Sequence, residues 1–216
     1  MTDDRKSAAA LIAGMTASII TMAFHPSGGS PEHFESIARL NVVVHSLALL
    51  FLPVLFLGAL GLTQRLSAPN RLSLSALVFY GFAEVAITIA ATASGLLYTG
   101  LMHHLHTADP AMHDTWNVAL QLAAHLNQSF ALVFVVAASI AIVLWSAAIL
   151  KSRVMAHALG IYGCILGPLT ILAVLSGHIK LNVHGFGAII LGQAIWFFAA
   201  GIQLWRMKNI DSPISA

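Results

Sequence analysis

The sequence has very few charged residues and only one cysteine. Asp, Glu, Lys and Arg make up 8% of the 216 residues, and the formal net charge is +2. A soluble domain usually carries about a quarter charged residues, because water must solvate its surface, so a water-soluble enzyme is excluded. The single cysteine, Cys164, excludes a disulfide framework and a cysteine-based metal cluster. The small excess of Lys and Arg excludes a nucleic-acid-binding surface.

Most of the chain consists of long apolar stretches. Hydrophobic residues make up 58% of the chain, and the mean hydropathy is +0.86. A helix needs about 20 mostly apolar residues to cross the hydrocarbon core of a bilayer. We therefore predict an all-α membrane protein, a single domain over residues 1–216 in contact with the lipid bilayer. The six predicted transmembrane helices cover residues 7–24, 40–62, 72–102, 117–150, 154–177 and 184–205. The tryptophans are predicted to lie mostly near the membrane interfaces, as in aromatic belts: Trp116, Trp145, Trp196 and Trp205.

The distribution of Lys and Arg predicts the orientation of these helices. If the N-terminus is cytoplasmic, all of the ten Lys and Arg except Arg39 and Lys180 lie on the inner side. Cytoplasmic loops carry an excess of these residues, so we predict that both termini are cytoplasmic. No small-x-small cleavage site follows the first span, so we expect an uncleaved anchor. The expected location is a bacterial inner membrane.

Histidine is frequent, with 11 residues in a chain that otherwise avoids polar groups. On the predicted topology, all of them except His157 lie in outer loops or at the outer ends of spans. A histidine near the end of an outward-running helix is favoured by the helix dipole, which explains His25 and His178 without a function. His45 and His125 are harder to explain, because each lies inside an inward-running span, where an unpaired polar group is costly.

The histidines at the start of the inward-running helices suggest a metal or haem site. If these helices adjoin, the imidazoles of His45, His125 and His184 meet near the outer surface, and three protein ligands with an open position describe a catalytic zinc site. Two facing histidines would instead suit haem b, and the Met/His-rich segment 102–113 would suit copper. We predict such a site around His45 and His125, with His184 or His178 as further ligands. It would serve redox chemistry, metal handling or a membrane metalloenzyme.

Polar side chains also recur along the second and fourth predicted spans. Asn41 lies one turn before His45. The fourth span carries polar residues at intervals of mostly three or four: Asn117, Gln121, His125, Gln128 and Ser129. Residues at this spacing share one helix face, and a polar face on a membrane helix points to the bundle interior or to a wet cavity.

Glu84 supports an alternative function, because it is the only carboxylate inside a predicted span. An ionisable residue at that depth is a functional hypothesis by default. The alternative is a small-solute or proton-coupled carrier that uses Glu84 and the polar face of the fourth span. A third hypothesis is an accessory membrane subunit without chemistry, in a homo-oligomer or a larger membrane complex, where polar residues only join helices.

Overall fold

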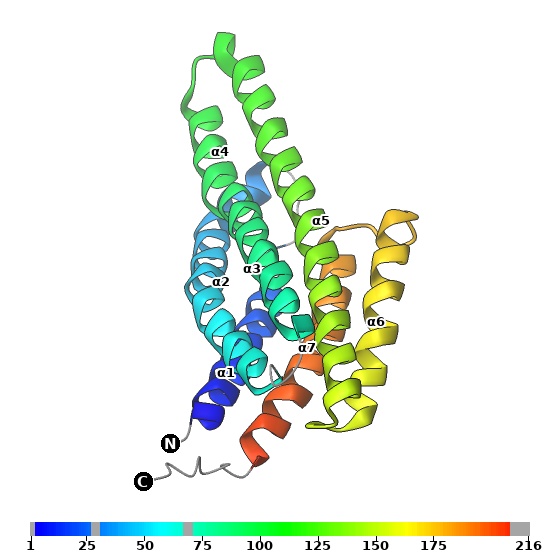
Figure 1. Ribbon diagram of the computed structural model, residues 1–216. Helices are drawn as coiled ribbons and strands as arrows, with labels where there is room; N and C mark the ends of the chain where they lie inside the picture. The colour runs from blue at the N-terminus through cyan, green and yellow to red at the C-terminus, as the bar shows by residue number, and fades with distance from the viewer. Residues whose placement is uncertain (1–2, 27–30, 67–70, 208–216) are drawn as a thin grey trace.

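The fold was described from a computed structural model, which describes residues 3–26, 31–66 and 71–207 (Figure 1). These residues are helical apart from short connections, and six helical segments among them are long and apolar enough to cross a membrane. This is the architecture of a multi-pass membrane protein. The helices are α1 (Asp3–Ala23), α2 (Pro31–Leu66), α3 (Arg71–Ala91), the π-helix η1 (Thr92–Leu97), α4 (Tyr98–Thr107), the 3₁₀-helix η2 (Pro110–Met112), α5 (His113–Ser152), α6 (His157–Leu175) and α7 (Val183–Arg206).

The helices form a bundle with two different ends. α1 packs against α2 and α7, α2 packs against α3, and α5 packs against both α3 and α6. α1 begins and α7 ends at the same end of the bundle, which we call the termini end (Figure 1). At the opposite end, α4 and the first part of α5 project beyond α6 and α7 as a helical hairpin. We call this the hairpin end.

Several helices extend beyond the predicted spans, mainly toward the hairpin end. The third helical segment continues to Thr107 rather than residue 102, and α5 begins at His113 rather than residue 117. Hydropathy marks the part of a helix that suits lipid, whereas the helix itself continues through polar residues. The Met/His-rich segment 102–113, which lies between the third and fourth predicted spans, is therefore helical up to Thr107, and η2 leads into α5.

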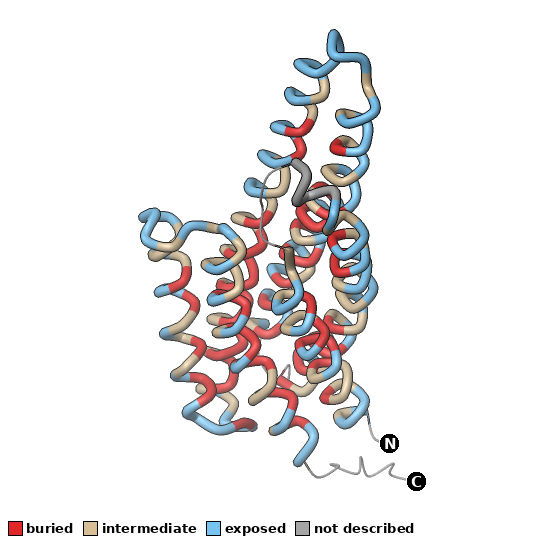
Figure 2. Tube along the Cα trace, turned by 180° about the vertical axis from the view of Figure 1, so that it is seen from behind, coloured by how far each residue is buried: buried red, intermediate tan, exposed pale blue. Residues whose placement is uncertain are grey.

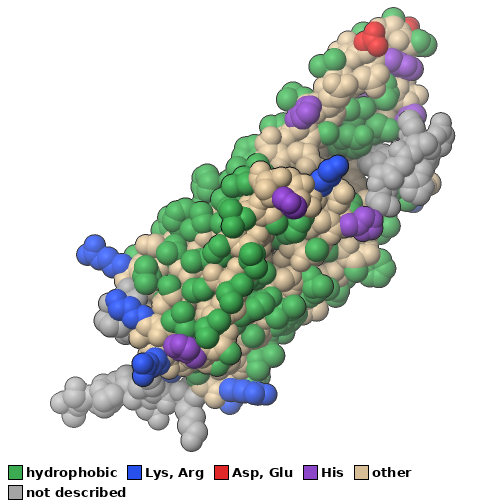
Figure 3. Space-filling view, turned by 90° about the vertical axis from the view of Figure 1, so that its right-hand side faces the viewer, with side chains coloured by type: hydrophobic (Ala, Val, Ile, Leu, Met, Phe, Trp, Pro, Cys, Tyr) green, Lys and Arg blue, Asp and Glu red, His purple; other side chains and the backbone are tan. Residues whose placement is uncertain are grey.

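Positive charge is concentrated at the termini end. Arg39 and Lys180 lie in the hairpin half, and the other Lys and Arg of the described segments lie near the helix ends at the termini end. Figure 3 shows this asymmetry on one face, with acidic side chains at the tip of the hairpin. Lys208, which contributes to the predicted excess, lies outside the described residues, as does the side chain of His33.

The most tightly packed part of the bundle lies toward the termini end (Figure 2). Trp145 and Trp196 are both fully buried there, and their stacked rings have centroids 5.9 Å apart. A buried indole needs a partner for its N–H group. Nε1 of Trp145 donates to Oγ1 of Thr63, and Nε1 of Trp196 donates to Oγ of Ser146, each over 3.0 Å. These two tryptophans are therefore core residues and do not face the lipid as residues of an aromatic belt do.

Candidate functional site

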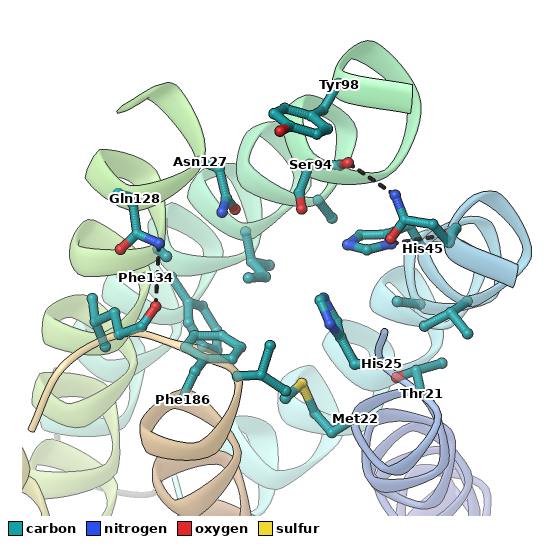
Figure 4. A pocket seen from close by; sticks show the side chains of 18 of the residues that line it. Thr21, Met22, His25, His45, Ser94, Tyr98, Asn127, Gln128, Phe134 and Phe186 are labelled. Atoms are coloured by element: carbon teal, nitrogen blue, oxygen red, sulfur yellow. Dashed lines mark hydrogen bonds between the residues drawn. The ribbon is translucent and has the colours of Figure 1, made fainter. Parts of the chain in front are cut away.

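A cavity of about 1080 Å³ extends from the hairpin end into the middle of the bundle, and Figure 4 shows part of its lining. Its walls come from α1, α2, the continuous segment α3–η1–α4, α5 and α7, together with the α6–α7 connection. Most of the lining is apolar, and none of the described residues that line it is Lys or Arg. Exposed Asp114 and Asn117 form part of its rim toward the hairpin end. The size and composition are those of a site for an organic molecule.

Two buried polar side chains, Glu84 of α3 and Gln193 of α7, contribute to the lining at depth. Their exposed fractions are 8% and 3%. No hydrogen bond of ordinary geometry to either carboxyl oxygen of Glu84 is found among the described residues, but the hydroxyl of Tyr80, one turn earlier on α3, lies close enough to interact with the carboxyl group. Nε2 of Gln193 also has no partner among the described residues. Leaving a buried polar atom unsatisfied costs about 1–3 kcal/mol, and more when it is charged. A bound group that satisfied these atoms would recover that free energy.

One face of α5 adds a polar wall to the cavity. Asn117, Gln121 and Gln128 line it as the sequence predicted, and Nε2 of Gln128 donates to the carbonyl oxygen of Leu181 over 3.2 Å. His125 and Ser129, which we placed on the same face, do not line the cavity and are exposed. Each residue turns an α-helix by about 100°, so a position next to Ala124 or Gln128 points to a different side.

His25 and His45 form a pair on the opposite wall. His25 follows the end of α1, and His45 lies on α2, where it is only 5% exposed. Their ring centroids are 4.8 Å apart, and the ring planes meet at 67°. Both rings border the cavity, as Figure 4 shows. The pair therefore brings two imidazoles from different elements into one space.

Backbone hydrogen bonds determine the tautomer of both imidazoles. Nδ1 of His25 lies 3.0 Å from the carbonyl oxygen of Pro26, and Nδ1 of His45 lies 2.8 Å from that of Asn41. A carbonyl oxygen only accepts, so Nδ1 carries the hydrogen in both rings, and in a neutral imidazole Nε2 then keeps its lone pair. Burial lowers the pKa of His25 more than the hydrogen bond to Pro26 raises it, which favours the neutral ring.

The π-helix η1 makes room for His45. Nδ2 of Asn41 donates to the carbonyl oxygen of Ser94 over 3.1 Å and to Oγ1 of Thr99 over 2.9 Å. Gly95, in the same turn, lies directly against His45, and a Cβ atom at this position would overlap the histidine side chain. π-Helical turns within α-helices occur frequently at functional sites. Here the turn and its glycine position one member of the histidine pair.

The predicted three-histidine site is not formed in this structure. His45 lines the cavity, whereas His125 and His184 are exposed on other faces of α5 and α7. His178 is also exposed, and its Nδ1 lies 2.7 Å from Oγ of Ser176. Within residues 3–26, 31–66 and 71–207, no group of three or more His, Cys, Asp or Glu is placed to hold a metal ion. α2, α5 and α7 run in the same direction, but α5 begins beyond α7 (Figure 1), and the rotation of each helix determines where its histidine points.

The sequence analysis gave His25 no functional role, whereas the structure places it in the histidine pair. Its position at the end of an outward-running helix had a sufficient explanation in the helix dipole. The positions of the two histidines relative to the spans could have indicated the pair, because His25 lies just after the first predicted span and His45 just inside the next one. Neighbouring antiparallel spans place such residues at the same level of the membrane.

Because the two rings are in direct contact, they leave no slot between them for a porphyrin, so the pair does not fit haem b.

Comparison of the chain with protein-family models, curated proteins and solved structures gives no match. The cavity and its side chains are therefore the basis for the proposed function.

Proposed function

We propose that this protein is a membrane carrier for a small organic cation with an apolar body, and that the cation exchanges with a proton on Glu84. The observation that supports this proposal is the buried carboxyl group of Glu84, which lines a large and mostly apolar cavity and has the neutral hydroxyl of Tyr80 as its neighbour rather than a cation. Glu84 lies thirteen residues after the start of α3 at Arg71. This places it about 20 Å along the helix axis, inside the hydrocarbon core.

The charges around the cavity favour a cationic substrate. An ionised carboxylate without a partner is strongly unfavourable at this depth. Glu84 is therefore neutralised either by a proton or by the charge of a bound cation. No Lys or Arg among the described lining residues competes with the substrate for the carboxylate. Apolar side chains such as Leu52, Phe134 and Phe186 would contact the body of the substrate.

The arrangement of the bundle supports transport rather than storage. The cavity reaches the exposed hairpin-end residues Asp114 and Asn117, whereas the stacked Trp145 and Trp196 fill the bundle toward the termini end. A carrier that opens alternately to the two sides of the membrane has a state in which its cavity is open at one end and closed at the other. The excess of Lys and Arg at the termini end favours a cytoplasmic location for that end. In a bacterial inner membrane, the cavity would then open to the periplasm.

The proposal is tested with tetraphenylphosphonium, an apolar monovalent cation. Equilibrium dialysis would measure its binding to the detergent-purified protein, and proteoliposomes would measure its uptake. Glu84→Gln keeps the size of the side chain and removes the charge. Since a hydrogen bond or ion contact to a charged group contributes about 1.5–3 kcal/mol, we expect a loss of affinity of about 10- to 100-fold. The affinity of the wild type should rise with pH, because the cation displaces a proton.

The matched control is Asp109→Asn, which removes a carboxylate from the exposed hairpin and does not touch the cavity lining. Asn also caps helices, so it can replace Asp109, whose side chain accepts from the backbone N–H of Ala111. This variant should bind the cation as the wild type does. Equal binding by the wild type and Glu84→Gln would refute the proposal. Uptake that is the same with and without a pH gradient would refute proton exchange.

A further inference from the structure

We propose that His25 and His45 bind one copper(I) ion at the wall of the cavity, with the thioether of Met22 as a third ligand. The site is separate from Glu84. His45 packs against Gly95, and Glu84 lies eleven residues earlier along the same helical segment. This spacing corresponds to about 16 Å along the helix axis. The copper site therefore does not depend on the proposed transport of an organic cation.

The tautomers of the two rings are those of metal-binding histidines. Both Nδ1–H groups are bonded to backbone carbonyl oxygens, which leaves a free lone pair on Nε2 of each neutral ring. No hydrogen bond to either Nε2 is found among the described residues. Metal-ligating histidines almost always donate their other ring N–H to a carbonyl, carboxylate or water, which fixes the tautomer and orients the ring. A cation between the two Nε2 atoms would satisfy both lone pairs.

The positions of the two rings are fixed by their neighbours before any ion binds. His45 is buried between the carbonyl of Asn41 and the π-helical turn at Gly95. His25 is held by Pro26 and by the backbone bond from its N–H to the carbonyl oxygen of Met22, over 3.2 Å. The edge-to-face contact at 4.8 Å places the two rings within reach of one ion. An ion bonded to both would be bound about 2.0–2.1 Å from each nitrogen.

The third side chain decides between copper and zinc. Met22 lies one helical turn before His25, and both side chains line the cavity (Figure 4). The terminal methyl group of Met22 lies near Gly187 of α7, so the thioether would turn from α7 toward the pair to bind the ion. Imidazole binds zinc and copper alike, whereas a thioether is a soft ligand that selects copper(I). A structural zinc site would need four ligands, commonly with thiolates or carboxylates. Within the described residues, no carboxylate or thiolate joins the histidine pair in a group that could hold a metal. The neutral N₂S donor set therefore suits copper(I).

The experiment is an anaerobic titration of the untagged, detergent-purified protein with copper(I), in competition with a chromophoric chelator. The expected result is one copper(I) per chain. His25→Ala and His45→Ala should each weaken the affinity by about 100-fold or more, since even the loss of an outer partner costs about 10- to 100-fold. His125→Ala and His184→Ala are matched controls, because each removes an exposed histidine of a membrane helix. Both should bind copper as the wild type does.

Two further measurements make the result specific. X-ray absorption at the copper edge should show one sulfur and two nitrogen neighbours in the wild type, and Met22→Leu should remove the sulfur signal. Thermal unfolding of each variant identifies any loss of folding. His25 follows the end of α1 outside the membrane-spanning segments, so His25→Ala is expected to fold even if His45→Ala does not.

Unchanged copper affinity in folded His25→Ala protein would overturn the assignment. So would a loss of binding in His125→Ala or His184→Ala, or zinc binding at the pair tighter than copper(I). The outcome is distinguishable from a failure of the carrier proposal. Glu84→Gln should keep its copper, and a protein that binds copper without binding tetraphenylphosphonium would retain this site and lose only the transport function.

Discussion

The side-chain amide of Asn41 on α2 donates a hydrogen bond to the backbone carbonyl oxygen of Ser94 in the π-helix, over 3.1 Å. The same amide donates to Oγ1 of Thr99 over 2.9 Å, and the carbonyl oxygen of Asn41 accepts from His45. A polar residue that is 3% exposed thus connects two membrane helices and the histidine pair. Asn41, which the sequence identified only as a polar neighbour of His45, holds the π-helical turn in place.

Asn41→Ala should destabilise the protein more than Thr99→Val does. The first change removes two hydrogen bonds and leaves two acceptors without this donor, which should lower the free energy of unfolding by about 1–3 kcal/mol. The second removes the acceptor of one of these bonds, together with the local bond that Oγ1 of Thr99 donates to the carbonyl oxygen of Gly95 over 2.8 Å, and should cost about 1 kcal/mol. Thermal unfolding in one detergent measures both. If Thr99→Val is as damaging as Asn41→Ala, the bond to Ser94 adds no more to stability than the bond from Thr99 to Gly95 does.

Gly95→Ala tests whether the π-helical turn makes room for His45. A Cβ atom at Gly95 would overlap the side chain of His45, and overpacking of this kind costs about 1–3 kcal/mol. We expect a lower unfolding temperature and weaker copper(I) binding. Gly100→Ala is the control in the same helical segment, because a Cβ atom there meets no neighbour. Since alanine favours helix over glycine by about 1 kcal/mol, this control should be as stable as the wild type or more stable.

Hydropathy was sufficient to predict the six membrane-spanning helices, because lipid accepts only long apolar segments with satisfied backbones. The ends of the helices were predicted less well. Residues 103–107 are polar enough to end an apolar stretch, yet they continue the helix into the projecting hairpin. Glu84, Asn117, Gln121 and Gln128 all line the cavity. Their spacing along the helices could be recognised in the sequence, because it depends only on position along one helix.

The histidine partners did not follow from the sequence, because they depend on how separate helices are rotated against each other. His125 is one position beyond Ala124, which lines the cavity, and this single step turns it away. His45 meets His25 only because Gly95 and the π-helix allow a close approach of the neighbouring segment. Hydropathy and spacing carry no information about such contacts between helices.

Glu84→Gln and Glu84→Met should keep or raise the stability of the protein. No hydrogen bond of ordinary geometry to either oxygen of Glu84 is found among the described residues, and the neighbouring hydroxyl of Tyr80 can also bond to a glutamine, so little favourable interaction is lost in Glu84→Gln. Glu84→Met loses in addition any contact with Tyr80. Replacing an unsatisfied buried group by a side chain of similar shape is nearly neutral or stabilising. We expect an unfolding temperature equal to or above that of the wild type, together with the loss of cation binding. A marked fall in the unfolding temperature would show that Glu84 joins helices and would argue against a substrate-binding role.

The stability of the metal-free protein should fall in mild acid, in part because of His25. Burial lowers the pKa of His25 in the folded protein below its ordinary value of 6.5. As the pH falls through 6.5, the unfolded chain takes up a proton at this residue before the folded protein does, so the unfolded state binds more protons and the free energy of unfolding decreases. At higher pH the ring is neutral in both states and has no such effect. Thermal unfolding between about pH 7.5 and pH 5.5 measures the change.

His25→Gln should show a smaller decrease in stability over the same range, because this variant has no imidazole to protonate. His184→Gln removes an exposed histidine and should follow the wild type. His45 is the titratable group in ring contact with His25, so the comparison is made with His45 unchanged in both proteins. A chelator must be present throughout, since a bound metal competes with protons for the same Nε2 atoms. If His25→Gln loses as much stability in acid as the wild type, protonation of His25 does not limit the folded state.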